Sequence, residues 1–162
     1  MHVEHRYPVE PGRLLAVLTH PAFLSARNKR YGGAGPPSVA QHNGQVVITV
    51  PRQLPMEHVP SAFHRFVGNG RFTQVDTWMS IADERATGRW VVDTGRAPIR
   101  LSGTHSVTAS SEGSLHVVAG EVTVNLPVVG GKLAREVDAH LTDLVRHEMS
   151  FMADWLTSGR AS

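Results

Sequence analysis

The last third of the chain carries its clearest pattern of apolar and polar positions. At about 100° per residue, seven apolar residues fall on one stripe: Leu133, Val137, Leu141, Leu144, Phe151, Met152 and Trp155. This spacing predicts one long amphipathic helix that buries its apolar stripe on a sheet. Glu148 lies near the middle of the stripe. It is therefore either a residue at the open end of a groove or a polar anchor inside a cavity.

Before this helix the pattern changes to a period of two, which predicts strands. Asn43-Gly44 is a strong hairpin signal between two of them. We expect strands at 3–7, 39–42, 45–51, 72–81, 89–94, 99–110 and 114–126, helices at 13–19 and 22–30, and one or two helical turns at 61–67. Residues 83–88 are predicted to form a connection. The order β-α-α-β6-α indicates one α+β domain over residues 1–158, with a short tail at 159–162.

Alternation along the strands predicts which residues face inward. We expect two inward sets, one of Ile99, Leu101, Gly103, His105 and Val107, the other of Val118, Gly120, Val122 and Val124. In strand 72–81 the predicted inward residues are Val75, Thr77 and Met79, because the opposite phase buries Trp78 together with Asp76. Inward glycines at 103 and 120 favour a cavity, since they remove side-chain volume.

The composition narrows the classes of function. Hydrophobic residues make up 41% of the 162 residues, charged residues 19%, and the net charge is +2, a balance typical of a soluble globular protein. The densest basic run is only Arg27, Lys29 and Arg30, and the other basic residues are scattered. Because nucleic-acid binders usually carry a basic stripe, this distribution argues against nucleic-acid binding. The absence of cysteine excludes disulfides, thiolate zinc sites and cysteine nucleophiles. Without an apolar leader or a stretch of ~20 apolar residues, we expect a cytoplasmic protein with no membrane span.

Three segments resemble a known family. HRYPVEPGRLLAVLTHPAFLSARNKRYGG (5–33) resembles the strand and paired helices that open START-like (SRPBCC) domains, and QVDTWMS (74–80) resembles their central strand. VTVNLPVVGGKLAREVDAHL (122–141) resembles their strand-to-helix junction. Together the three segments resemble the actinobacterial family DUF2505 of unknown function over nearly the whole chain, and the P-V-V-G-G-K junction is the specific part. The resemblance implies a helix-grip fold, in which a curved antiparallel sheet of about seven strands wraps the C-terminal helix around a cavity. Superfamily members include lipid carriers, polyketide cyclases and aromatases, and hormone receptors, so the fold does not choose a function.

Several side chains are expected to face this cavity. The predicted ligand-binding residues are Val75, Thr77, Met79, Trp90, Val92, Leu101, His105, Val137, Leu141, Leu144, Glu148 and Met152. Glu148 either contacts a ligand, as a hydrogen-bonding group or a general acid or base, or pairs with an arginine of the sheet. His105 either contacts a ligand or bonds to a backbone carbonyl.

Other candidate chemistry is weaker. His140, Asp143 and His147 follow one helix edge at spacings of three and four, but no HExxH is present, and a solvated edge is the simpler interpretation. No G-x-S-x-G occurs either. We therefore expect no catalytic residue set, no metal and no cofactor.

Three functions remain open from the sequence. The favoured one is binding or transport of a small hydrophobic molecule, such as a lipid, polyketide or isoprenoid. The second is a cyclase- or aromatase-like enzyme in which Glu148 or His105 transfers a proton. The third is an interaction domain with a packed core. The oligomeric state is left open.

Overall fold

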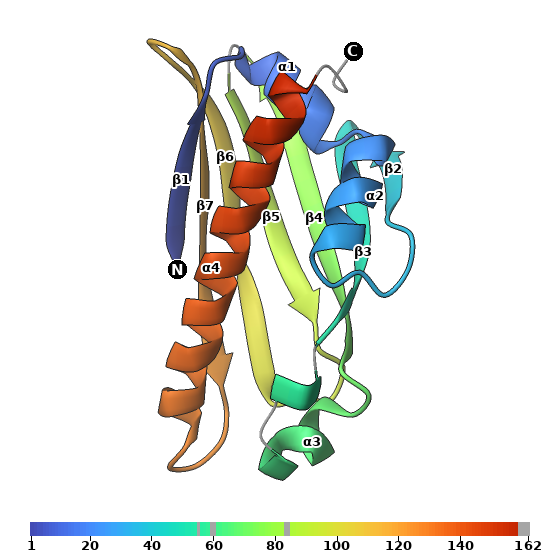
Figure 1. The fold of residues 1–162 in the computed structure, drawn as a ribbon, viewed down its shortest axis with the longest axis vertical. Coiled ribbons are helices and arrows are strands. Elements are labelled where there is room, and N and C mark those ends of the chain that lie inside the picture. The colour runs from blue at the N-terminus through green and yellow to red at the C-terminus, as the bar shows by residue number, and fades with distance from the viewer. Residues whose placement is uncertain (55, 59–60, 83–84, 159–162) are drawn as a thin grey trace.

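The computed structural model describes residues 1–54, 56–58, 61–82 and 85–158. Its seven strands form one antiparallel sheet in the order β1-β7-β6-β5-β4-β3-β2 (Figure 1). The elements are β1 (His2–Tyr7), α1 (Pro11–Leu18), α2 (Pro21–Arg30), β2 (Ser38–His42), β3 (Gln45–Gln53), a 3₁₀ turn at Met56–His58, α3 (Ser61–Val67), β4 (Arg71–Ala82), β5 (Arg85–Asp93), β6 (Ile99–Ser110), β7 (Gly113–Val124) and α4 (Gly130–Thr157). The predicted order of elements is confirmed.

Strands two to seven follow one another in the sheet in chain order, with short connections everywhere except between β3 and β4, where residues 54–70 include the 3₁₀ turn and α3. Each of these strands pairs with the next along the chain, and β2 and β3 meet at the predicted Asn43-Gly44 turn. Both turn residues have positive φ, 49° and 76°, as a tight two-residue hairpin requires. The first strand then pairs with the last, β1 with β7. This pairing brings the N-terminal strand beside the strand that leads into α4 (Figure 1).

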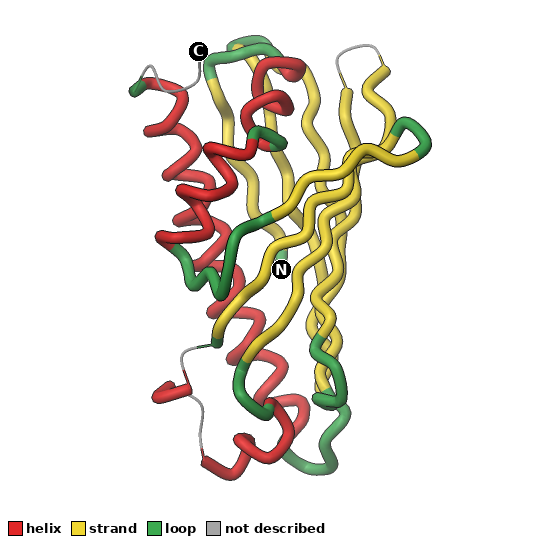
Figure 2. Tube along the Cα trace, turned by 90° about the vertical axis from the view of Figure 1, so that its right-hand side faces the viewer, coloured by secondary structure: helices red, strands yellow, loops and turns green. Residues whose placement is uncertain are grey.

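The helices cover one side of the curved sheet. Figure 2 shows them together on that side, with α4 running along most of its length. Gly130 begins α4 where an added Cβ would strike the carbonyl oxygen of Val124, so a side chain is excluded at this junction. Two clusters of buried apolar residues join the layers. The larger contains Leu14, Phe23, Ile48, Trp78 and Met152, and the smaller contains Val3, Trp90, Val118 and Met149.

The predicted phase of β4 is wrong. Asp76 and Trp78 are the buried residues, with exposed fractions of 3% and 4%, whereas Val75, Thr77 and Met79 lie on the opposite face of the strand. The prediction assumed that a carboxylate avoids the interior. A buried charge is tolerated when it is hydrogen-bonded or paired, and Asp76 has such partners.

The predicted connection at 83–88 is too long. Residues 85–88 belong to β5, and residues 83–84 lie outside the described part of the chain. Ala86 pairs with Val107 and Gly88 with Trp78, and both Ala86 and Gly88 are buried. Pairing with neighbouring strands therefore outweighs the low strand propensity of this charged, glycine-containing segment.

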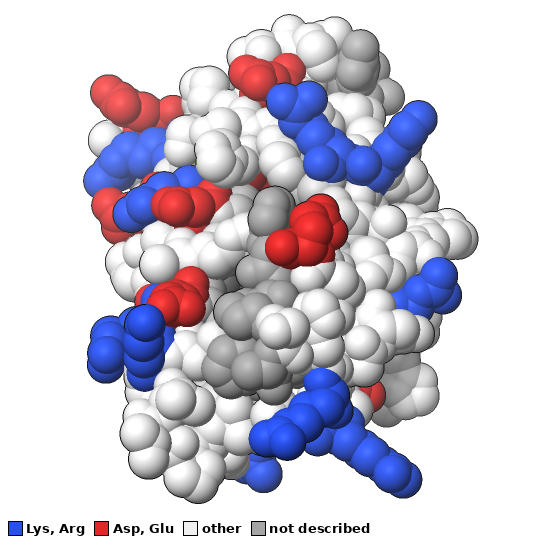
Figure 3. Space-filling model, turned by 60° about the horizontal axis from the view of Figure 1, so that its bottom comes forward, with Lys and Arg blue, Asp and Glu red and all other residues white. Residues whose placement is uncertain are grey.

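Two surface properties bear on the expected partners. No helix in the described ranges combines the length and apolar character needed to cross a membrane. On the face in Figure 3, the described Lys and Arg residues lie in separate groups with Asp and Glu residues between them. This face therefore lacks the continuous basic stripe typical of nucleic-acid binding.

Candidate functional site

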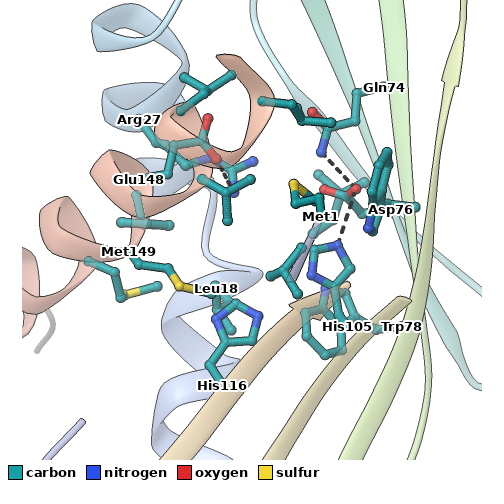
Figure 4. Close-up of a pocket in the computed structure, with 18 of the residues that line it drawn as sticks. Met1, Leu18, Arg27, Gln74, Asp76, Trp78, His105, His116, Glu148 and Met149 are labelled. Carbon is teal, nitrogen blue, oxygen red and sulfur yellow. Dashed lines mark hydrogen bonds and ion pairs between the residues drawn. The ribbon is translucent and has the colours of Figure 1, made fainter. Parts of the chain in front are cut away.

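A cavity of about 70 Å³ lies between the sheet and α4 (Figure 4). Most of its wall is apolar and includes Leu18, Phe23, Ile48, Trp90 and Met149. The sheet contributes alternate residues of β3 to β7, because every second side chain of a strand faces the same side. The helix contributes Leu141, Leu144, Val145, Glu148, Met149 and Met152, which follow its apolar face.

A network of linked polar side chains crosses this apolar wall. Arg52 on β3 donates from Nη2 to Glu148 Oε1 at 2.8 Å, and from Nε and Nη2 to Gln74 Oε1 at 3.1 and 3.0 Å. The amide nitrogen of Gln74 then donates to Asp76 Oδ1 at 2.8 Å. His105 Nε2 lies 3.6 Å from the same oxygen. This polar network links α4 to the centre of the sheet.

Both carboxylates of this polar network, Glu148 and Asp76, are held ionised. Burial alone raises the pKa of Glu148, but Arg52 and Arg27 outweigh it and place the pKa below its ordinary value. Burial also raises the pKa of Asp76, and contacts with His105, Arg27 and Gln74 reverse this effect. Glu148 thus pairs with an arginine of the sheet, as the simpler interpretation predicted. An ionised, doubly paired Glu148 does not suit a general acid.

His116, on β7, is a buried imidazole that remains neutral. Its exposed fraction is 5%, and burial, together with its neighbours His105 and Arg27, lowers its pKa to about 3. Its ring stacks against that of His105, with centroids 5.8 Å apart. Neither ring nitrogen of His116 has a hydrogen-bond partner among the described residues.

Arg27, on α2, is a buried cation with few acceptors. Its exposed fraction is 8%, and its Nη1 lies 3.7 Å from Glu148 Oε2, beyond hydrogen-bond distance. Within the described chain, Nε and Nη2 have no hydrogen-bond partner. By contrast, Arg52 also donates from Nη1 to the Tyr31 carbonyl at 2.9 Å. Of the two arginines at this site, Arg27 is therefore the one whose buried N–H donors lack acceptors in the part of the chain that the structure describes.

The structure brings together seven of the twelve predicted site residues: Trp90, Val92, His105, Leu141, Leu144, Glu148 and Met152 line the cavity. Leu101 and Val137 are partly buried outside its lining. The other three, on β4, lie on the opposite face of the sheet, as described above. A ligand-binding role for the seven lining residues remains a prediction.

The inward glycines on β6 and β7 do not enlarge the cavity as expected. An added Cβ at Gly103 would strike the carbonyl oxygen of Ala119 and would lie 2.7 Å from Trp90 Nε1, and one at Gly120 would strike the ring of the same tryptophan. The indole fills the space and donates to the carbonyl oxygen of Ala119 at 3.1 Å. The close approach of Trp90 and of the paired strand's backbone, and not open volume, explains these glycines.

The sequence interpretation missed several lining residues. Val145 and Met149 continue from Leu141 at spacings of four, and His116 precedes Val118 by two, so periodicity contains a signal for these three. Arg27, Arg52 and Gln74 carry no signal, because their meeting depends on packing between distant segments. On the far edge of α4, His140, Asp143 and His147 are exposed. The described residues contain no metal-binding group of acids and histidines.

Comparison with known proteins extends these observations. The family model "Protein of unknown function (DUF2505)" matches residues 2–156. Uncharacterized protein Rv0481c of Mycobacterium tuberculosis is 28% identical over 115 residues, or 70% of this chain. The match spans 65% of that relative's length, and Mb0491c of Mycobacterium bovis gives the same values.

Solved structures with low sequence identity share the fold. TTHA0849 from Thermus thermophilus has a TM-score of 0.61 at 15% identity, covering 98% of this chain and 97% of its own. Ms6760 from Mycobacterium smegmatis has a TM-score of 0.55 at 9% identity, covering 97% and 90%. At such identities the likeness concerns architecture alone. The chain has the helix-grip fold and belongs to the DUF2505 family, whose function is unknown.

Proposed function

We propose that this protein binds a small molecule with an apolar body and polar oxygen groups in the cavity between the sheet and α4. The observation that carries the proposal is the unmet hydrogen-bonding capacity of Arg27, His105 and His116 within a largely apolar wall. Buried polar groups of native proteins are nearly always hydrogen-bonded. A bound molecule that supplies the missing partners accounts for both features.

The cavity must widen to admit a ligand of ordinary size. Its volume of about 70 Å³ suits several waters, whereas pockets for drug-sized ligands measure about 300–1,000 Å³. Three methionines line it: Met1, Met149 and Met152. Methionine side chains are unbranched and adapt to different shapes. We infer that rotation of these side chains, with a shift of α4, opens the cavity on binding.

A packed interaction domain is the main competing function. The small volume is compatible with it, since such a domain needs no cavity. The buried guanidinium and imidazoles argue against it, because a core selected only for packing gains nothing from unpaired polar groups. Bound ligand, if present, distinguishes the two directly.

Native mass spectrometry of the protein purified from a mycobacterial host, followed by solvent extraction, tests the proposal. We expect a stoichiometric adduct of the wild-type protein. Leu144→Trp, which fills the cavity, is expected to lose it. Val129→Trp adds the same side chain at a residue that is 43% exposed and does not line the cavity, and we expect it to retain the adduct. A wild-type protein that is empty and binds no member of a panel of lipids, quinones and aromatic ketones would refute the proposal.

A second candidate function is proton transfer in the same cavity. It is favoured by the contact between His105 and the ionised Asp76, because a carboxylate that orients an imidazole is a recurrent acid–base pair. This places the candidate chemistry at His105 and not at Glu148. Conversion of the extracted ligand by the wild type, lost in His105→Gln with binding retained, would support this function.

A further inference from the structure

The polar atoms left unpaired in the cavity differ in kind. Arg27 offers hydrogen-bond donors at Nε and Nη2, and neutral His116 offers one donor and one acceptor. Figure 4 shows Arg27 beside Glu148 on one side of the cavity, with His105 and His116 on the sheet. A molecule that satisfies this set needs both acceptor and donor groups.

The tautomer of His105 follows from its neighbour. Asp76 is ionised and can only accept hydrogen bonds. The carboxylate therefore favours the neutral tautomer of His105 that carries its proton on Nε2, the ring nitrogen that faces Asp76 at 3.6 Å. In the neutral imidazole the lone pair lies on Nδ1, which is buried and has no partner in the described chain. This atom requires a donor, which a carboxylate cannot supply and a hydroxyl group can.

With His105 in its neutral form, the charges at the site already balance. Arg27 and Arg52 contribute two positive charges, and the ionised Glu148 and Asp76 contribute two negative ones. An anionic ligand would add an uncompensated charge to a buried site, which is unfavourable. A neutral oxygen acceptor instead satisfies Arg27 without changing the balance.

We propose that the ligand is a neutral hydroxy-carbonyl compound on an apolar, preferably aromatic, frame. Its carbonyl oxygen accepts from Arg27, and its hydroxyl group bonds to the imidazoles of His105 and His116. The frame lies against Trp78, which stacks on His105 with ring centroids 5.1 Å apart, and against Trp90. This inference rests on the proposed function, because it concerns the same cavity.

Four aromatic probes of similar size test the inference by isothermal titration calorimetry at pH 7. The first, 3′-hydroxyacetophenone, has both groups, whereas acetophenone lacks the hydroxyl and 3-ethylphenol lacks the carbonyl. The fourth, 3-hydroxybenzoate, replaces the carbonyl group with a carboxylate. We expect 3′-hydroxyacetophenone to bind at least about tenfold more tightly than each of the others, since one unmet buried hydrogen bond accounts for such a factor.

The outcomes separate this inference from the proposed function. Equal or tighter binding of 3-hydroxybenzoate, or equal binding of all four probes, overturns the inference and leaves the proposed function intact. If no probe binds, the adduct extracted from the protein decides: a neutral hydroxy-carbonyl compound supports the inference, an acid overturns it, and no adduct together with no binding overturns both.

Arg27→Met provides a second test. We expect it to reduce the affinity for 3′-hydroxyacetophenone to that of 3-ethylphenol, while 3-ethylphenol itself binds within about twofold of its wild-type affinity. Arg13→Met is the matched control, because Arg13 is exposed on α1. Unchanged preference for 3′-hydroxyacetophenone in a folded Arg27→Met protein would show that Arg27 does not hold the carbonyl group. The wild-type probe series remains decisive even if this variant does not fold.

Discussion

Glu148→Gln isolates the charge that joins α4 to the sheet. The carboxylate is only 13% exposed, and it faces Arg52 at 2.8 Å and Arg27 at 3.7 Å. Glutamine has nearly the same shape but removes the negative charge that faces both guanidinium groups. We therefore expect the variant to fold and to be clearly less stable than the wild type at pH 7.

The size of the loss follows from two opposing contributions. Removing one partner of a buried ion pair costs about 3–5 kcal/mol. The glutamine oxygen keeps a hydrogen bond from Arg52, and an ordinary hydrogen bond contributes about 1 kcal/mol. The free energy of unfolding should thus fall by about 2–4 kcal/mol, equivalent to a decrease of about 1–2 M in the urea midpoint for a slope near 2 kcal/mol/M.

Urea unfolding, followed by tryptophan fluorescence and circular dichroism, measures this change. Asp143→Asn is the control, because Asp143 pairs with Arg146 at 3.1 Å while both side chains are more than half exposed. Exposed pairs contribute little, so we expect a change below about 0.5 kcal/mol.

The pH dependence gives an independent check. The folded pKa of Glu148 lies below its unfolded value of about 4.5, so its stabilisation is present above that pH and is lost as pH falls through the folded pKa. The difference between wild type and Glu148→Gln should shrink as the pH is lowered below 4.5. A loss under about 1 kcal/mol at pH 7, or a difference that persists unchanged at acidic pH, would refute this account of the ion pair.

Three further substitutions test the packing around the cavity. Gly120→Ala places a methyl group against Trp90 and should lower the free energy of unfolding by about 2 kcal/mol or more, whereas Gly12→Ala, which has open space on α1, should raise it by up to about 1 kcal/mol; urea unfolding checks both. His116→Phe removes two unpaired polar atoms and should raise the stability of the ligand-free protein by about 1 kcal/mol, and a lower urea midpoint would contradict this. Met149→Ala should cost about 2–4 kcal/mol and strengthen calorimetric binding of a larger aromatic probe such as naphthalene.

Much of the fold is predictable because two periodicities run through long segments. The change from a period of two to a period of 3.6 near residue 130 specifies a sheet followed by a helix that must cover it. The β4 strand shows where this reasoning ends. Its phase depends on whether Asp76 is buried, and burial of an acid depends on partners such as His105, which lies on a strand two places away in the sheet.

The candidate site was less predictable than the fold for a related reason. Its polar residues come from α2, β3, β4, β6, β7 and α4, and each segment supplies one or two of them. No short motif contains such a set. Arg27 looks like part of a basic helix end in the sequence, and only its packing against Glu148 makes it a buried cation.

The two walls of the cavity differ in what they can contribute to recognition. On the sheet, Trp90 packs against two glycines and Trp78 stacks on His105. The imidazole of His105 is therefore positioned by a rigid aromatic ring. On α4 the wall consists largely of methionine and aliphatic side chains, which change conformation at low cost. In the proposed complex, the sheet together with Arg27 of α2 would determine the polar groups of the ligand, whereas α4 would determine its size. Substitutions at Leu144 or Met149 should thus change which ring systems bind, while substitutions at His105 should change which polar groups bind.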